Sequence, residues 1–139
     1  MTNDLLKVIE ELTELAHGAH IKTPPPDDFL IDSYQKDIGV LFSEDYKVFL
    51  KKASTIFYGE IDPFVITIDK SSRSELSVAI VDAQSLGLPK GWLPICEDNG
   101  DYYCLTKDNT IRFWTSNGMS NDSWPSLGAW IKEVWIKKK

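Results

Sequence analysis

The sequence contains few of the residues that form metal or redox centres. It has two cysteines and two histidines among 139 residues. Cys96 and Cys104 are separated by a spacing that fits no zinc site. His17 and His20 lie one turn apart on a predicted helix and could share a metal ion, but the sequence offers no evident third ligand. We therefore predict that both histidines lie at the solvent edge and that the protein has no metal site and no cofactor.

The common catalytic motifs are also missing. The chain has no glycine-rich phosphate loop, no G-x-S-x-G turn and no H-E-x-x-H helix. Asp27 and Asp28 are adjacent at a predicted helix start, where neighbouring side chains diverge by about 100° and cannot act on one atom. Residues 98–101 lack the ligand spacing of a calcium loop. The sequence therefore predicts a protein that is not an enzyme.

Two further classes of partner are disfavoured. No apolar run approaches the roughly 18 residues that span a membrane, and the start of the chain lacks the pattern of a secretion signal. We therefore expect a cytoplasmic protein with both cysteines reduced. The net charge of −6 argues against a nucleic acid or an anionic membrane as a direct partner.

The chain has the size of one domain, residues 1–139, and its acidic charge is uneven. Residues 1–69 carry 13 acidic and 6 basic side chains, whereas residues 70–139 carry 8 acidic and 9 basic ones. Such asymmetry arises either from a solvated acidic face or from a dedicated binding face, and composition alone favours the solvated face.

The strongest structural signal is Asn99-Gly100 between two apolar runs. Both turn residues tolerate a positive φ, so the pair is typical of a two-residue β-hairpin turn. This register pairs Asp98 with Asp101 and points the two cysteines to opposite faces, which excludes a disulfide. The pairs that it predicts are Asp98 with Asp101, Glu97 with Tyr102, Cys96 with Tyr103, and Ile95 with Cys104.

Helices are predicted on both sides of this hairpin. Apolar spacing indicates an amphipathic helix within residues 1–23 and a closing helix after Trp124. Capping residues indicate a second helix from Pro26-Asp27-Asp28 to Gly39 and a third that begins at Ser43. We expect four apolar residues of the second helix to face inward: Phe29, Leu30, Tyr34 and Ile38. Tyr46, Phe49 and Leu50 are expected to face inward from the third.

The remaining segments are less distinctive. Phe64–Ile68 is β-rich and predicts a core strand, whereas residues 71–86 fit either a helix or a strand. Residues 111–114 predict a third strand of the meander, and 117–122 predict a loop. Together the elements indicate an α+β fold. We expect a central, mostly antiparallel or mixed sheet, with helices from both termini packed mainly on one face and apolar cover on part of both faces.

Four segments in a fixed order carry a family resemblance. The first is the helix at residues 29–38, and the second, residues 41–50, is similar to a leucine-proline-x-x-tyrosine-x-x-phenylalanine-leucine pattern. The third, residues 93–105, is similar to a hairpin with the pattern glycine-aspartate-x-x-cysteine-leucine, and the fourth is 111–114. In this order they resemble the SUKH superfamily, which includes fungal cell-wall assembly regulators and many bacterial toxin-immunity proteins. The resemblance covers about residues 27–135 and departs from the pattern at Phe42-Ser43 and at residues 53–55.

The resemblance implies a cytoplasmic, non-catalytic immunity protein that binds and neutralises a cognate polymorphic or contact-dependent toxin, with nucleases among the candidates. The alternative is an intracellular regulatory or scaffolding module that resembles the fungal regulators. In both cases the partner is a protein. The sequence specifies neither the partner nor the oligomeric state.

Acidic residues and one tryptophan are the candidates for partner binding. Three acids crowd the hairpin turn, and three more near the start of the second helix would join them if that helix packs nearby. Trp124 precedes a proline in a loop-like stretch, so it fits both an interface anchor and a lid on the final helix. The candidate partner-binding residues are Glu97, Asp98, Asp101, Asp27, Asp28, Asp32 and Trp124.

Overall fold

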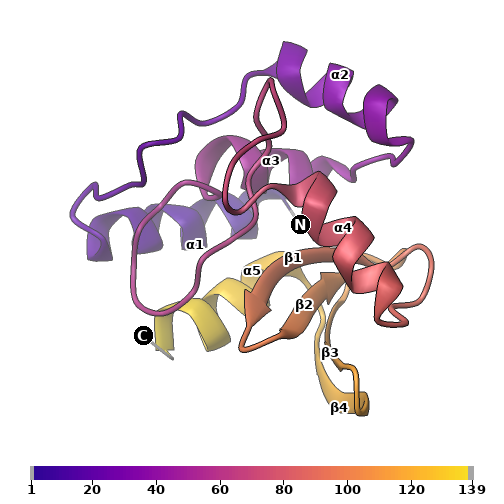
Figure 1. Ribbon diagram of the computed structural model, residues 1–139. Helices are drawn as coiled ribbons and strands as arrows, with labels where there is room; N and C mark the ends of the chain where they lie inside the picture. Colours follow the sequence, from indigo (N-terminus) through magenta and orange to yellow (C-terminus); the bar gives the residue numbers. More distant parts are fainter. Residues whose placement is uncertain (1, 138–139) are drawn as a thin grey trace.

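The computed structural model describes residues 2–137, which form an α+β fold (Figure 1). This confirms the predicted fold class. The helices are α1 (Thr2–Leu15), α2 (Asp28–Ile38), α3 (Glu44–Lys52), α4 (Leu76–Ser85) and α5 (Leu127–Trp130), the last of which continues as a π-helical segment, Ile131–Ile136. The strands are β1 (Leu93–Asp98), β2 (Asp101–Leu105), β3 (Ile111–Thr115) and β4 (Gly118–Trp124).

The four strands form an antiparallel meander in the order β1-β2-β3-β4. Asn99 and Gly100 have φ values of 54° and 89°, so the predicted hairpin turn is confirmed. The predicted pair of Ile95 with Cys104 is wrong, because a bulge shifts the register and Pro94 stands opposite Cys104. The Ile95 carbonyl instead accepts a hydrogen bond from the Phe64 N–H at 3.0 Å.

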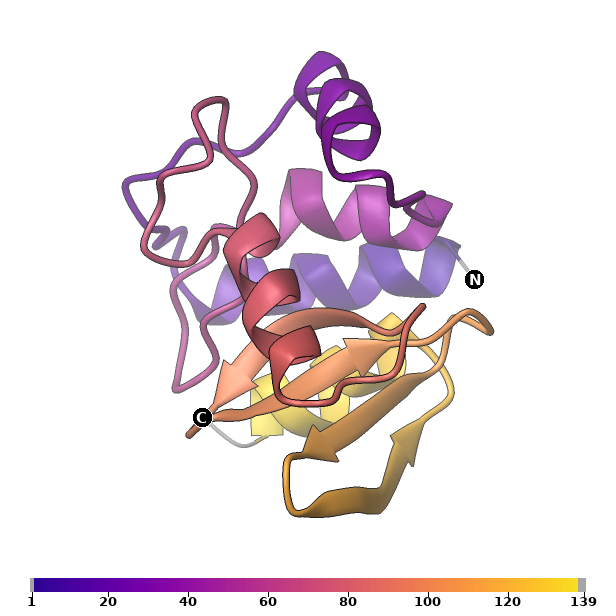
Figure 2. The same ribbon diagram turned by 45° about the vertical axis from the view of Figure 1, so that its right-hand side comes forward.

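Helices cover both faces of the sheet. Figure 2 shows α4 in front of the sheet and α5 behind it. Tyr103 projects toward α5, where its ring lies 5.4 Å from that of Trp130. Helix α1 packs against α3 and α5, so the two terminal helices lie together, as predicted. Residues of α3, α5 and the π-helical segment form an aromatic core: Tyr46, Phe49, Trp130 and Trp135, all fully buried.

The helix boundaries follow the local capping chemistry. The Asp27 side chain accepts a hydrogen bond from the Leu30 N–H at 2.8 Å, and Gly39 ends α2 with a φ of 71°. Ser43 caps α3 through the Tyr46 N–H at 3.2 Å. These starts and stops were predictable because each depends on neighbouring residues. Residues 71–86, for which two structures were possible, contain α4.

Three expectations about apolar or polar segments are wrong. Phe29 is 81% exposed, because the buried side of α2 centres on Ile31 and Tyr34 instead. Phe64, Val65 and Ile66 are buried as expected, but residues 64–68 form no strand: Val65 makes an isolated bridge to Glu75, and Ile68 is 84% exposed. Residues 118–122, expected in a loop, belong to β4, whose polar side chains fit an exposed edge strand.

Candidate partner-binding surfaces

The hairpin turn presents charge above a buried apolar layer. Glu97 is exposed, while Asp98 and Asp101 are half-buried and stand opposite each other in the register. Beneath them Tyr102 is only 5% exposed. In the described part of β1 and β2, none of the large hydrophobic side chains is exposed. This tip therefore attracts cations but offers no large apolar side chain to a partner.

The acids of α2 take part in the local structure. Asp27 caps the helix, and the Asp28 carboxylate pairs with the Lys51 ammonium at 2.8 Å. The hydrogen bond and the charge of Lys51 lower the pKa of Asp28. Asp32 is exposed on the same helix. The positions of Asp27 and Asp28 at the start of α2 also complement the helix dipole.

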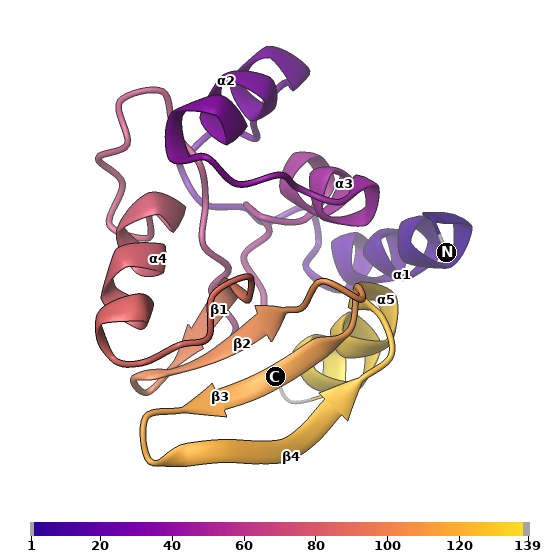
Figure 3. The ribbon, with the colours of Figure 1, turned by 90° about the vertical axis from the view of Figure 1, so that its right-hand side faces the viewer.

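The two acidic groups do not meet. In Figures 1 and 3, α2 lies at the top of the molecule, and Figure 3 shows the β1–β2 turn in the lower half, below α4. The structure therefore has two separate acidic regions, where the sequence left open a single combined surface.

A groove runs between α2 and residues 66–70, and we call it the α2 groove. Its cavity volume is about 600 Å³. Phe29 and Ile68, which are 81% and 84% exposed, line it from opposite walls. Its charged lining consists of Asp27, Asp37, Asp69 and Lys70. Sequence reasoning missed this groove because it expected both Phe29 and Ile68 to be buried.

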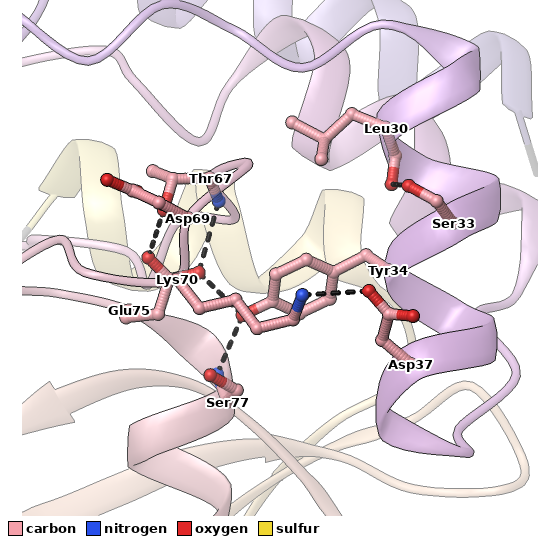
Figure 4. Close-up of polar contacts among 9 residues, drawn as sticks. All are labelled: Leu30, Ser33, Tyr34, Asp37, Thr67, Asp69, Lys70, Glu75 and Ser77. Atoms are coloured by element: carbon pink, nitrogen blue, oxygen red, sulfur yellow. Dashed lines mark hydrogen bonds and ion pairs between the residues drawn. The ribbon is translucent and has the colours of Figure 1, made fainter.

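The floor and walls of the α2 groove are tied together by a buried carboxylate (Figure 4). Glu75 is 1% exposed and accepts a hydrogen bond from the Tyr34 hydroxyl at 2.6 Å. It also accepts from the backbone N–H groups of Thr67 and Ser72, at 3.0 and 3.1 Å, and from the Thr67 hydroxyl. The Ser77 N–H in turn donates to the Tyr34 oxygen at 2.9 Å. Several donors to one buried carboxylate fix this segment against α2 and α4.

Tyr34 and Lys70 add further contacts between α2 and residues 66–70. Burial, and then the hydrogen bond to Glu75, raise the pKa of Tyr34. The Lys70 ammonium lies over the Tyr34 ring, 5.2 Å from its centroid, and pairs with Asp37 of α2 at 2.8 Å. Ser72 and Glu75 have the S-x-x-E spacing of a capping box. This spacing is the sequence signal that could have identified Glu75 as a structural residue.

A second groove lies between the end of α2 and α4, and we call it the Leu41 groove. Its cavity volume is about 660 Å³, and it is lined by Leu41 and Val81, which are 91% and 66% exposed. Lys90 and Lys107 supply its charge, and the described residues that line it include no carboxylate. The two grooves thus resemble each other in apolar exposure and differ in the sign of their charge.

Trp124 lies far from the acidic hairpin turn. It pairs with Ile111 at the end of the sheet opposite Asn99-Gly100. Its half-buried ring packs edge-on against Tyr103, with the ring centroids 5.7 Å apart. These contacts favour the lid interpretation of Trp124 over that of an interface anchor.

The cysteines and histidines do not come together in a common metal or redox site among the described residues. Cys96 and Cys104 are free and buried, and burial raises the pKa of the Cys96 thiol to about 12. His17 and His20 are exposed, and α1 ends at Leu15 before either of them. Within residues 2–137, no three metal-ligating side chains are grouped together. None of the helices in this described range combines the length and the apolar character that a membrane crossing requires.

The fold places this protein in the α+β class, with a four-stranded antiparallel meander. Comparison with known proteins identifies its family. A family model described as SMI1-KNR4 cell-wall (SUKH_5) matches residues 5–136, so the chain belongs to this SUKH family. A solved structure of a protein from Pseudomonas syringae pv. tomato is similar, with 30% identity and a TM-score of 0.83. The similarity covers 94% of this chain and 98% of that one. Among curated proteins, none matches significantly.

Proposed function

We propose that this protein is a non-catalytic immunity protein that binds and neutralises a cognate toxin domain in the cytoplasm. Family membership supports this role, since the SUKH superfamily includes many toxin-immunity proteins. The observation that carries the proposal is the pair of acidic regions, one at the β1–β2 turn and one at α2, on a frame with a fully buried aromatic core.

The physical mechanism is steering followed by occlusion. A nuclease or other enzyme that acts on nucleic acid has a basic substrate cleft. Acids at Glu97, Asp98 and Asp101 raise the rate of encounter with such a cleft through long-range attraction. The acids of α2 lie beside exposed apolar side chains and therefore suit close contact. Bound in the cleft, the immunity protein excludes the substrate without performing any chemistry.

A regulatory or scaffolding module is the second candidate. The description of the matching family, SMI1-KNR4 cell-wall, favours it. Such a module would use the same exposed surfaces to hold signalling proteins together. The two candidates differ in the partner and agree that the protein acts by binding.

Co-expression with a toxin domain separates the two candidates. The full chain is co-purified with the toxin domain encoded beside its gene, and growth is measured while the toxin is induced. An immunity protein forms a stoichiometric complex and restores growth. A protein that forms no complex and gives no protection against any adjacent toxin is not an immunity protein. Neighbouring genes that encode no toxin would favour the scaffolding module.

A further inference from the structure

We propose that the α2 groove binds a segment of the partner protein in which an apolar side chain is flanked by lysine or arginine. The apolar side chain would lie between Phe29 and Ile68, and the cationic side chains would pair with Asp27, Asp37 and Asp69. This inference rests on the proposed function to the extent that the protein acts by binding another protein.

The apolar part of the argument starts from exposure. Phe29 and Ile68 are among the most exposed large hydrophobic side chains in the described residues, and both face one cavity. Single exposed hydrophobics are ordinary on a surface, but two on opposite walls of a groove form a site for a third apolar group. Because both are so open, the groove does not enclose a small ligand, which suits the surface of a protein.

The charge of the groove selects the chemistry of the occupant. Three aspartates and one lysine line it, and the lysine, Lys70, is already paired with Asp37. The Lys70 ammonium rests on the Tyr34 ring beside that carboxylate, so the groove already holds one cation of its own chain. The Leu41 groove has a similar apolar exposure, but its charge comes from Lys90 and Lys107. Charge complementarity therefore assigns a basic occupant to the α2 groove.

Rigidity favours binding without rearrangement. The hydrogen bonds of Glu75 hold the wall that carries Ile68, and the Asp27 cap holds the first turn of α2, which carries Phe29. A partner that binds between fixed walls loses little affinity to the ordering of side chains and loops.

The test uses two synthetic peptides of equal length and the full chain labelled with ¹⁵N. One peptide places a leucine-phenylalanine pair between lysine-arginine pairs, and the other replaces every cation with glutamate or aspartate. We expect the basic peptide to shift the amide resonances of residues 27–38 and 66–70 and the acidic peptide to leave them unchanged. Phe29→Ser and Ile68→Ser should each weaken binding of the basic peptide by about tenfold or more.

The control variant is Leu41→Ser, which removes an equally exposed apolar side chain from the Leu41 groove. It should leave the affinity for the basic peptide unchanged, and all three variants should keep the thermal midpoint of the parent protein. Shifts confined to the β1–β2 turn, or equal binding of both peptides, would overturn the proposal.

The same variants separate this inference from the proposed function. If the adjacent toxin domain binds the parent protein and both groove variants equally well, the groove assignment is wrong and the immunity role stands. If the basic peptide binds the groove but no adjacent toxin binds the protein, the groove assignment stands and the immunity role is wrong.

Discussion

The α2 region carries four acids, counting its cap Asp27, and the β1–β2 turn carries three, but the acids have different surroundings. At α2, Asp27 caps the helix and Asp28 pairs with Lys51, while Phe29 stands exposed beside them. At the turn, Asp98 faces Asp101 across the hairpin, and the aromatic side chain below, Tyr102, is buried. Clusters of acids that look alike in a sequence therefore do not define equal surfaces.

This difference indicates which rate each region affects when a partner binds, the rate of association or the rate of dissociation. Charge alone acts at a distance and is screened by salt, so the hairpin turn changes mainly the rate of association. Charge beside exposed apolar area supplies contact as well, and this affects the rate of dissociation. Four comparisons of variants, ordered from the largest expected effect on stability to the smallest, test the structural roles on which this division rests.

The largest effect is expected from a pair of phenylalanines. Phe49→Ala removes a fully buried ring that packs on Trp130 and Trp135, and should lower the free energy of unfolding by about 3–5 kcal/mol. Phe29→Ala removes an exposed ring and should change it by less than about 0.5 kcal/mol. Denaturant titration measures both. A similar loss from each variant would show that Phe29 supports the fold and is not available for binding.

Two buried tyrosines provide the next comparison. Tyr34→Phe removes one of the donors to the buried Glu75 carboxylate and the acceptor of the Ser77 N–H, and should cost about 1–3 kcal/mol of stability. The Tyr46 hydroxyl is buried without a hydrogen-bond partner among the described residues, so Tyr46→Phe should be neutral or stabilising.

Hydrogen exchange can also show which segment the Tyr34→Phe substitution destabilises. Hydrogen exchange in Tyr34→Phe should accelerate in residues 66–75 before it does so in the sheet, because Glu75 fastens that segment. Equal stability of the two variants would refute the structural role given to Glu75.

The helix cap should have a smaller effect. Asp27→Ala removes the side-chain acceptor of the Leu30 N–H and should lower the free energy of unfolding by about 1 kcal/mol. Asp27→Asn keeps an acceptor without the charge and should recover most of this loss. Thermal unfolding of the two variants distinguishes the cap from the charge, since a purely electrostatic role would make them equally destabilised.

The smallest effect on stability is expected at the hairpin. Changing Glu97 and Asp101 together to Ser should alter the free energy of unfolding by less than about 0.5 kcal/mol, because like charges at this turn repel only mildly. Association with the toxin domain should slow at low salt and differ little at moderate salt. An equal loss of affinity at both salt concentrations would show that the turn itself is the contact surface.

The sequence predicted the features whose chemistry is local. Asp27, Ser43 and Gly39 define helix ends through their own side chains or backbone, and Asn99-Gly100 defines a turn in the same way. The buried positions of α3 followed from helical spacing. Family resemblance in the sequence was confirmed by the match over residues 5–136.

The sequence did not predict the features that depend on contacts between distant segments. The direction that α2 faces is set by Ile31 and Tyr34, so the exposure of Phe29 follows from packing and not from spacing. Residues 64–68 have the composition of a strand but form a bridge at a single position, Val65 with Glu75. The α2 groove depends on the orientation of α2 and on the irregular path of residues 64–68. It could therefore be recognised only from the three-dimensional structure.

Hydrogen exchange of the complex tests the central claim most directly. The full chain is compared free and bound to the toxin domain encoded beside its gene, and exchange is followed by mass spectrometry. If the α2 groove is the contact surface, exchange slows most in peptides covering residues 24–38 and 64–72, and little in residues 95–104. Slowing confined to residues 95–104 would contradict the account and assign the contact to the hairpin turn.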